Sequence, residues 1–149
     1  MSQFITLSDL AGITPEIILT LTAICVLSLE MMRFSKPSFS FLIAVLGLGV
    51  AGIVIFQGAG YSGLLFGGML KINLFTTFFD LLYLAIGLIT LLFSPGYLEK
   101  KGSEYRGEYP ALIIFSLIGM MLMTRANDLL ILFLGLELLS LSLYVLVGF

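Results

Sequence analysis

The sequence contains no histidine and a single cysteine, and only 11% of its 149 residues are charged. Without histidine, the chain lacks the commonest metal ligand and the usual general base near neutral pH. Cys25 alone can form neither an internal disulfide nor a cysteine-rich metal site. Seven Lys and Arg residues stand against nine Asp and Glu residues, a net charge of −2. We therefore expect no nucleic-acid partner, because the chain has no basic excess.

Apolar residues are abundant and make up 60% of the chain. A soluble fold of this size could not remove that much apolar surface from water. The composition excludes a cytosolic enzyme, a disordered tail and a disulfide scaffold. It predicts an all-α membrane protein that crosses the bilayer several times.

Apolar runs long enough for helical membrane spans occur five times, at residues 15–32, 39–56, 74–93, 110–126 and 128–149. The fourth run is the shortest, and it spans only if its flanks join the helix. Thr14 and Pro15 suit the start of the first span, and Ser94-Pro95-Gly96 is expected to end the third. The link between the last two runs is very tight, with Asn127 or Asp128 available as a helix cap. These two spans should form an antiparallel hairpin.

Basic residues are distributed unequally between the two sides of such a bundle. One side has five of them: Arg33, Lys36, Lys100, Lys101 and Arg106. The other side has two, Lys71 and Arg125. Because basic loops stay in the cytoplasm, we expect the N-terminus to lie outside.

Glycine is concentrated in the long link between the second and third spans. Residues 58–63 fit the pattern G-x-G-x-x-G, which in some proteins binds dinucleotides. That reading requires a strand before the motif and a helix after it. Here the motif follows a membrane span, so a flexible turn or a short β-hairpin is expected instead. Within the second span, the small-xxx-small spacing of Gly47 and Ala51 predicts close helix packing.

Glu137 is the most costly residue to place in a bilayer. It lies nine residues beyond Asp128, which at ~1.5 Å per residue puts it about 13 Å into the membrane. Ser140 and Tyr144 share its helix face, in a helix otherwise almost purely apolar. We interpret this polar face as a proton relay, with Glu137 as the main group. The alternative is a neutral Glu137 that hydrogen-bonds to a neighbouring helix.

Asp80 is the second acidic residue inside a span, six residues beyond Leu74 and hence about 9 Å in. It could serve a water-filled entrance for protons, or it could anchor the helix through Thr76 and Thr77. Glu16 lies in the first turn of its helix, where a carboxylate suits the helix dipole, and is assigned no chemistry. Arg125 is expected to pair with Asp128 across the tight turn.

Several segments resemble subunit N of respiratory complex I, the proton-pumping NADH-quinone oxidoreductase. The run from Pro110 to Phe149 resembles the fourth and fifth helices of that family. The likeness is greatest over Ala126-Asn127-Asp128-Leu129-Leu130-Ile131-Leu132-Phe133-Leu134-Gly135-Leu136-Glu137-Leu138-Leu139-Ser140-Leu141. Phe78-Phe79-Asp80-Leu81-Leu82 and the stretch from Phe93 to Glu99 resemble the third helix and its exit. The likeness is strong from Leu74 onward and weaker before it.

The resemblance implies the first part of an antiporter-like subunit of about fourteen helices in the inner cell membrane. It implies no redox chemistry in this chain, with NADH, FMN, iron–sulfur clusters and quinone bound by partner subunits. Glu137 matches a family glutamate that pairs with a lysine of the seventh helix in a chain of buried charges. The expected partners are the other membrane-arm subunits, the missing helices of the same subunit and the lipid bilayer. We expect a truncated chain, because the partner lysine is absent.

Two other functions remain open at this level. The chain could belong to a multi-subunit cation/proton antiporter, which would exchange Na⁺ without an NADH-oxidising partner. It could instead be a small structural or assembly protein, in which case Glu137 would tolerate replacement by glutamine.

Overall fold

A computed structural model describes residues 5–32, 36–101 and 108–148. Five of its helices are long and apolar enough to cross a membrane. They are α2 (Thr14–Met31), α3 (Pro37–Gln57), α4 (Leu74–Lys100), α5 (Glu108–Arg125) and α6 (Leu129–Gly148). A short helix α1 (Leu7–Gly12) precedes them. The predicted class, an all-α membrane protein with five spanning helices, is confirmed.

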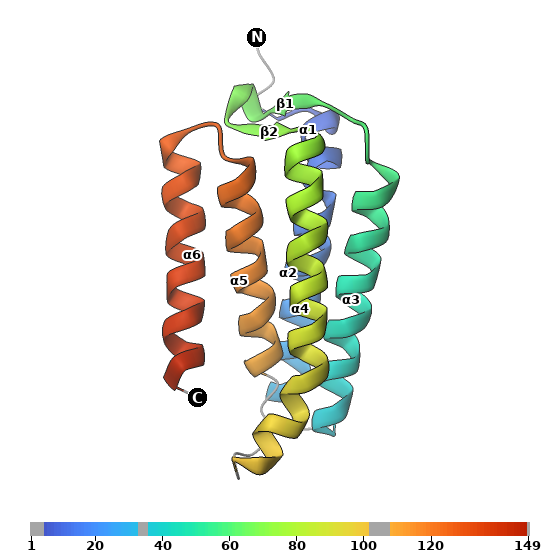
Figure 1. The fold of residues 1–149 in the computed structure, drawn as a ribbon, viewed down its shortest axis with the longest axis vertical. Coiled ribbons are helices and arrows are strands. Elements are labelled where there is room, and N and C mark those ends of the chain that lie inside the picture. The colour runs from blue at the N-terminus through green and yellow to red at the C-terminus, as the bar shows by residue number, and fades with distance from the viewer. Residues whose placement is uncertain (1–4, 33–35, 102–107, 149) are drawn as a thin grey trace.

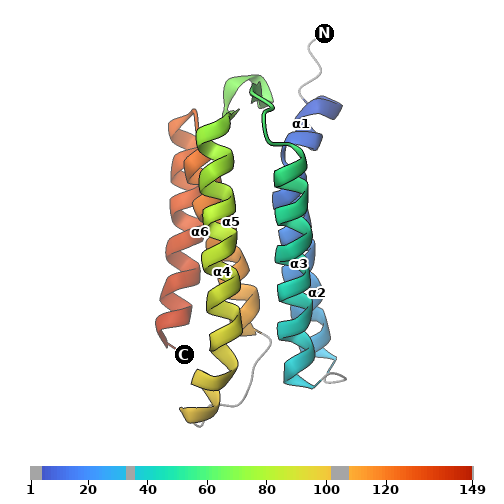
Figure 2. The same cartoon turned by 45° about the vertical axis from the view of Figure 1, so that its right-hand side comes forward.

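The long helices run up and down in two layers, with α2 and α3 in one and α4, α5 and α6 in the other (Figures 1 and 2). Helices α2 to α5 close into a ring, because α2 contacts both α3 and α5 while α4 contacts both of the same helices. Helix α6 lies outside this ring and packs mainly on α5. Only 11% of the spanning stretch of α6 is buried, whereas 56% of that of α5 is, so α6 is the least enclosed of the five helices.

The helix faces follow from the 3.6-residue period of the α-helix. In α3, the buried residues recur at intervals of three and four: Phe41, Ala44, Leu48, Ala51 and Ile55. The outward faces carry exposed apolar side chains such as Leu46 and Ile53, as expected of helices that face lipid. Gly47 lies against α2, where an added Cβ would meet the Thr22 side chain. The close packing predicted from Gly47 and Ala51 is therefore present.

The glycine-rich link forms the short hairpin that the sequence suggested. Strand β1 (Gly63–Leu65) pairs antiparallel with β2 (Leu70–Ile72), and the 3-10 turn η1 (Phe66–Gly68) joins them. Gly67 and Gly68 have φ of 66° and 92°, a conformation that side chains disfavour. Leu65, Leu70 and Ile72 are buried over the end of the bundle, so the hairpin closes that end (Figure 1).

Helix α4 departs from the predicted span. It continues past Phe93 to Lys100, with Pro95 inside it. Proline removes one intrahelical donor, but the Ser94 hydroxyl donates to the Thr90 carbonyl at 2.5 Å and supports the same turn. The expectation that Ser94-Pro95-Gly96 ends the helix is wrong, because one lost hydrogen bond does not stop a helix that is packed on its neighbours through Leu91 and Leu98.

Of the two predicted helix caps, the one at the start of α2 is wrong and the one at the start of α6 is confirmed. Thr14 lies inside α2, and its hydroxyl donates back to the Ala11 carbonyl instead of capping the helix. Asp128 does cap α6, since its carboxylate accepts from the Leu130 amide at 3.1 Å. Helices α5 and α6 pack as the predicted antiparallel pair.

Candidate functional site

Three charged side chains meet inside the closed end of the bundle. Arg125 ends α5, Glu16 lies in the first turn of α2, and Asp80 lies in the first half of α4. Their side chains are 4%, 8% and 0% exposed, respectively. We call these three residues the buried triad.

The Arg125 guanidinium organises the buried triad. Its Nε and Nη2 donate to Asp80 Oδ2 at 2.8 and 2.6 Å. Its Nη1 donates to the Gly12 carbonyl at 2.9 Å and lies 2.8 Å from Glu16 Oε1. One cation thus joins α1, α2, α4 and α5. The rigid fork of a guanidinium suits this role better than a single ammonium would.

Helix polarity explains why the charges meet. Helix α2 begins where α5 ends, since the two run antiparallel at this end of the bundle (Figure 1). A carboxylate is favoured at a helix N-terminus and a guanidinium at a C-terminus, so Glu16 and Arg125 each suit their own helix. Their mutual attraction adds to both effects.

The buried triad corrects three expectations from the sequence. Arg125 pairs with Asp80 and Glu16 instead of Asp128. Glu16, to which no chemistry was assigned, forms an ion pair with Arg125. Asp80 accepts from Arg125, and no hydrogen bond of the described residues joins it to Thr76 or Thr77; Thr76 instead forms a capping box with Asn73 at the start of α4. The predicted topology could have indicated that the three residues meet, since it put all three charges on the same side of the membrane.

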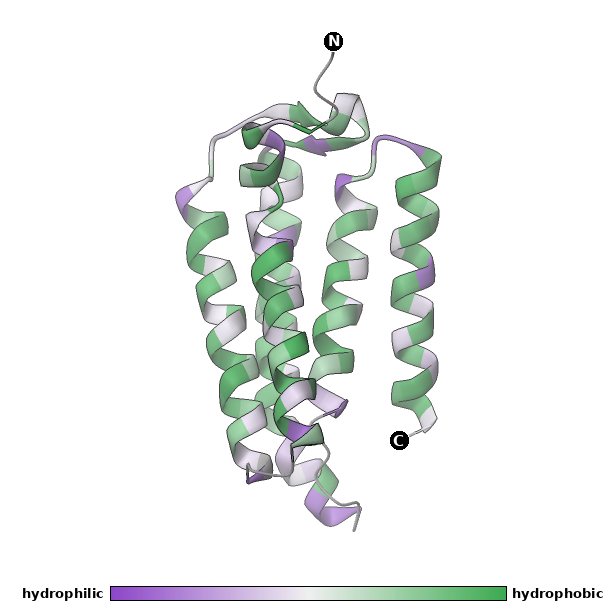
Figure 3. Cartoon of the chain, turned by 180° about the vertical axis from the view of Figure 1, so that it is seen from behind, coloured by the Kyte–Doolittle hydropathy of each residue, from purple (hydrophilic) through white to green (hydrophobic). Residues whose placement is uncertain are grey.

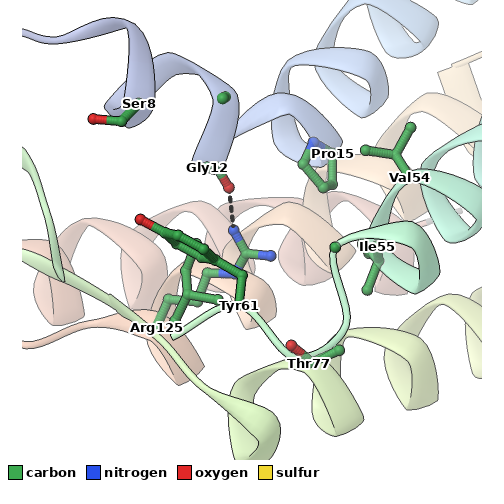
Figure 4. Close-up of a pocket in the computed structure, with 11 residues that line it drawn as sticks. Ser8, Gly12, Pro15, Val54, Ile55, Tyr61, Thr77 and Arg125 are labelled. Carbon is green, nitrogen blue, oxygen red and sulfur yellow. Dashed lines mark hydrogen bonds between the residues drawn. The ribbon is translucent and has the colours of Figure 1, made fainter. Parts of the chain in front are cut away.

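A cavity of about 320 Å³ lies beside the triad, under the hairpin segment. Its polar lining includes Tyr61, Thr77 and Arg125, and Pro15, Val54 and Ile55 supply apolar walls (Figure 4). Arg125 is the only member of the buried triad that lines it. Glu16 and Asp80 do not line the cavity.

Asp9 fastens the hairpin over this end. Its carboxylate accepts the backbone amides of Thr6 at 2.9 Å and of Phe66 at 3.0 Å. These two hydrogen bonds lower the pKa of Asp9 below its ordinary value. On the other side of the hairpin, the Asn127 amide group donates to the Gly68 carbonyl at 2.8 Å.

Glu137, Ser140 and Tyr144 lie on α6, away from the buried triad. Successive residues of a helix turn by ~100°, which places Glu137 about 200° from Gly135, the residue that meets α5. Glu137 is exposed and Ser140 is half-buried, while Tyr144 is 73% exposed. Figure 3 shows a hydrophilic position midway along the otherwise hydrophobic α6.

Within the described residues, no ion pair engages Glu137, and no group of His, Cys, Asp and Glu could hold a metal ion. Because α6 packs mainly on α5, residues on the opposite side of α6 are out of contact with the other four long helices. Any cation that pairs with Glu137 would therefore come from outside this bundle.

No model of a known protein family matches the chain. It is similar to NADH-quinone oxidoreductase subunit N from Chloroflexus aggregans, with 43% identity over 72% of this chain and 22% of that protein. It is also similar to subunit N 1 from Solibacter usitatus, with 35% identity over 95% of this chain and 29% of the relative. The chain thus spans less than a third of the length of these relatives.

Among solved structures, the chain resembles one chain of respiratory complex I from Thermus thermophilus with bound aureothin. The TM-score is 0.74 and the identity 25%, over 89% of this chain and 28% of that chain.

Proposed function

Because this chain belongs to the family of NADH-quinone oxidoreductase subunit N, we propose that it is part of the proton-translocating membrane arm of that enzyme. In this role, it moves protons across the inner membrane while partner subunits bind NADH, FMN, iron–sulfur clusters and quinone. The single observation that carries the proposal is the similarity to subunit N over nearly the whole of the chain.

We assign the proton relay within this chain to the polar face of α6. Glu137 is the main group because it is an ionisable side chain near the middle of a membrane-spanning helix, where such groups are rare and functional. Ser140 and Tyr144 share its side of α6 and can extend a hydrogen-bonded path. The face turns away from α5, which supports a cationic partner on a helix outside these five. Asp80 pairs with Arg125 at the closed end and has no contact with this face.

Glu137→Gln tests the relay, because glutamine keeps the size and removes the ionisable group. In membranes with the complete enzyme, we expect coupled NADH–quinone turnover and proton pumping to fall towards the ~10²-fold loss typical of a removed proton-transfer group. NADH oxidation with an artificial acceptor and the amount of assembled enzyme should stay normal. Glu137→Asp is the matched control and should retain part of the pumping. Full pumping by Glu137→Gln would contradict the assignment.

We also propose that the hairpin end of the bundle faces away from the cytoplasm. Lys36 and Lys100 lie at the opposite end, and Lys71 lies on the hairpin. Arg33 and Arg106, which the charge count also used, lie outside the described residues. Arg125 is paired with the carboxylates of Glu16 and Asp80. The hairpin end therefore has less unpaired positive charge than the number of its basic residues indicates.

A further inference from the structure

The buried triad carries unequal charge. Two carboxylates, Glu16 and Asp80, face one guanidinium. With both acids ionised, the cluster would hold one unmatched negative charge where its side chains are at most 8% exposed. An unmatched buried charge is costly, because protein there replaces water that would otherwise solvate it.

No second cation compensates the triad within the described residues. Helix α3 has no charged residue between Ser38 and Gln57. Asp9 of α1 is engaged by the Thr6 and Phe66 amides. Lys71 on the hairpin and Asp128 in the α5–α6 turn are exposed. Tyr61 lines the cavity and is 50% exposed.

The two carboxylates are held differently. Asp80 Oδ2 accepts two charge-assisted hydrogen bonds from Arg125, as an ionised carboxylate does. Glu16 Oε1 lies 2.8 Å from Arg125 Nη1 as an ion pair but has no hydrogen-bond partner among the described residues. Glu16 Oε2 and Asp80 Oδ1 are buried and have no hydrogen-bond partner among the described residues. An oxygen without a donor is better suited to carry a proton than to carry charge.

We propose that Glu16, Asp80 and Arg125 form a proton-binding site, separate from Glu137, in which the two carboxylates share one proton that resides mainly on Glu16. Binding forms one O–H bond on a carboxylate oxygen and takes the proton from a hydronium ion, which leaves as water. The charge of the site changes from −1 to zero. The site exists whether or not Glu137 acts as a relay.

The cavity under the hairpin gives the site its route to water. Arg125 lines the cavity and is bound to both carboxylates, whereas Glu16 and Asp80 do not line it. Its Nη1 is shared between the Gly12 carbonyl and Glu16. A turn of this guanidinium away from Glu16 therefore opens the carboxyl to water in the cavity, and its return closes the site. Protons accordingly exchange at the hairpin end of the bundle.

Infrared spectroscopy on the complete enzyme in membranes tests the site directly. A protonated carboxyl has a C=O stretch that an ionised one lacks. At neutral pH, we expect Glu16→Gln to remove one such band, and raising the pH should remove the same band from the unsubstituted enzyme. Loss of the band in Asp80→Asn but not in Glu16→Gln would place the proton on Asp80 and overturn the assignment to Glu16. If neither substitution removes a band, both carboxylates are ionised and the proposal fails.

Glu137→Gln is the control in these spectra. It should leave the band unchanged, so the outcome for the triad does not depend on the outcome for the relay. A band that disappears in Glu137→Gln and survives both triad substitutions would overturn the proposal.

Thermal unfolding of the assembled enzyme keeps the proposal testable if the spectra are crowded. Glutamine resembles a protonated glutamate, so Glu16→Gln should leave the unfolding temperature nearly unchanged. Adding Asp80→Asn leaves Arg125 without any carboxylate and should lower the temperature strongly. A Glu16→Gln variant as unstable as the double variant would show that Glu16 must be ionised, which contradicts the proposal.

Discussion

At the scale of single residues, Arg125 links four helices of the bundle through its hydrogen bonds and ion pairs. It contacts three other elements through one planar group. From the sequence, it looked like an interfacial residue beside a tight turn. Asp80 could be identified as unusual from its depth alone, but its partner is 45 positions away and only the packing of α4 against α5 reveals it.

Arg125→Met should destabilise the assembled enzyme by about 3–5 kcal/mol, because it leaves buried carboxylates without a cation. A lowered unfolding temperature and a reduced amount of assembled complex would measure this. Lys71→Met is the matched control, since Lys71 is an exposed cation on the same end. Equal stability of the two variants would contradict the role of Arg125.

Asp9 offers a test with a defined pH dependence. Its pKa is lowered by the Thr6 and Phe66 amides, so its contribution is complete above the ordinary carboxyl value of 3.8 and is lost as the pH falls through the folded value. Asp9→Ala should imitate the acid state at neutral pH. We expect faster hydrogen exchange at the Phe66 amide, while Ser8→Ala, an exposed neighbour, changes it little. Unchanged exchange in Asp9→Ala would show that other contacts hold the hairpin.

At the scale of elements, the α5–α6 pair depends on contact between two backbones. A Cβ at Gly119 would lie 2.8 Å from the Leu139 nitrogen, and one at Gly135 would lie 3.0 Å from the Met123 nitrogen. Backbone cannot move aside as a side chain can. The sequence indicated that these two helices pack, because the link is short, but it gave no sign of which glycines touch.

Gly119→Ala should therefore separate α5 and α6 and cost about 1–3 kcal/mol, the usual effect of overpacking. Gly49→Ala is a suitable control, because a Cβ there would meet no described atom within 4 Å apart from its two chain neighbours and the nearby backbone of its own helix. It should be neutral or slightly stabilising, since alanine favours helix. Unfolding temperatures of the two variants decide the matter.

At the scale of the whole molecule, composition and periodicity were enough to predict a five-helix membrane bundle, and the glycines of the link between its second and third spans left a flexible turn or a short hairpin open. They could not predict the ring of α2 to α5 with α6 outside it. That arrangement depends on which apolar faces meet, and nearly every face of these helices is apolar. The buried triad was missed for the same reason, since Glu16 and Arg125 looked ordinary in their own helices and nothing linked them to Asp80.

Orientation gives a prediction for the molecule as a whole. In a Cys25→Ser background, S62C lies just before the hairpin and S38C at the start of α3, at opposite ends of the bundle. A membrane-impermeant thiol reagent should label S62C in intact cells and S38C only after permeabilisation. The reverse pattern would place the N-terminus in the cytoplasm.

The wide spacing of the triad along the chain has a consequence for biosynthesis. Asp80 precedes Arg125 by 45 residues, which at about 5–20 residues per second corresponds to roughly 2–9 s of translation. During that interval, both acidic residues have left the ribosome and their cation has not. Helices α2 and α4 are therefore made before the residue that pairs with the carboxylates of Glu16 and Asp80. The two carboxylates can pair with Arg125 only after α5, the fourth spanning helix, has been made.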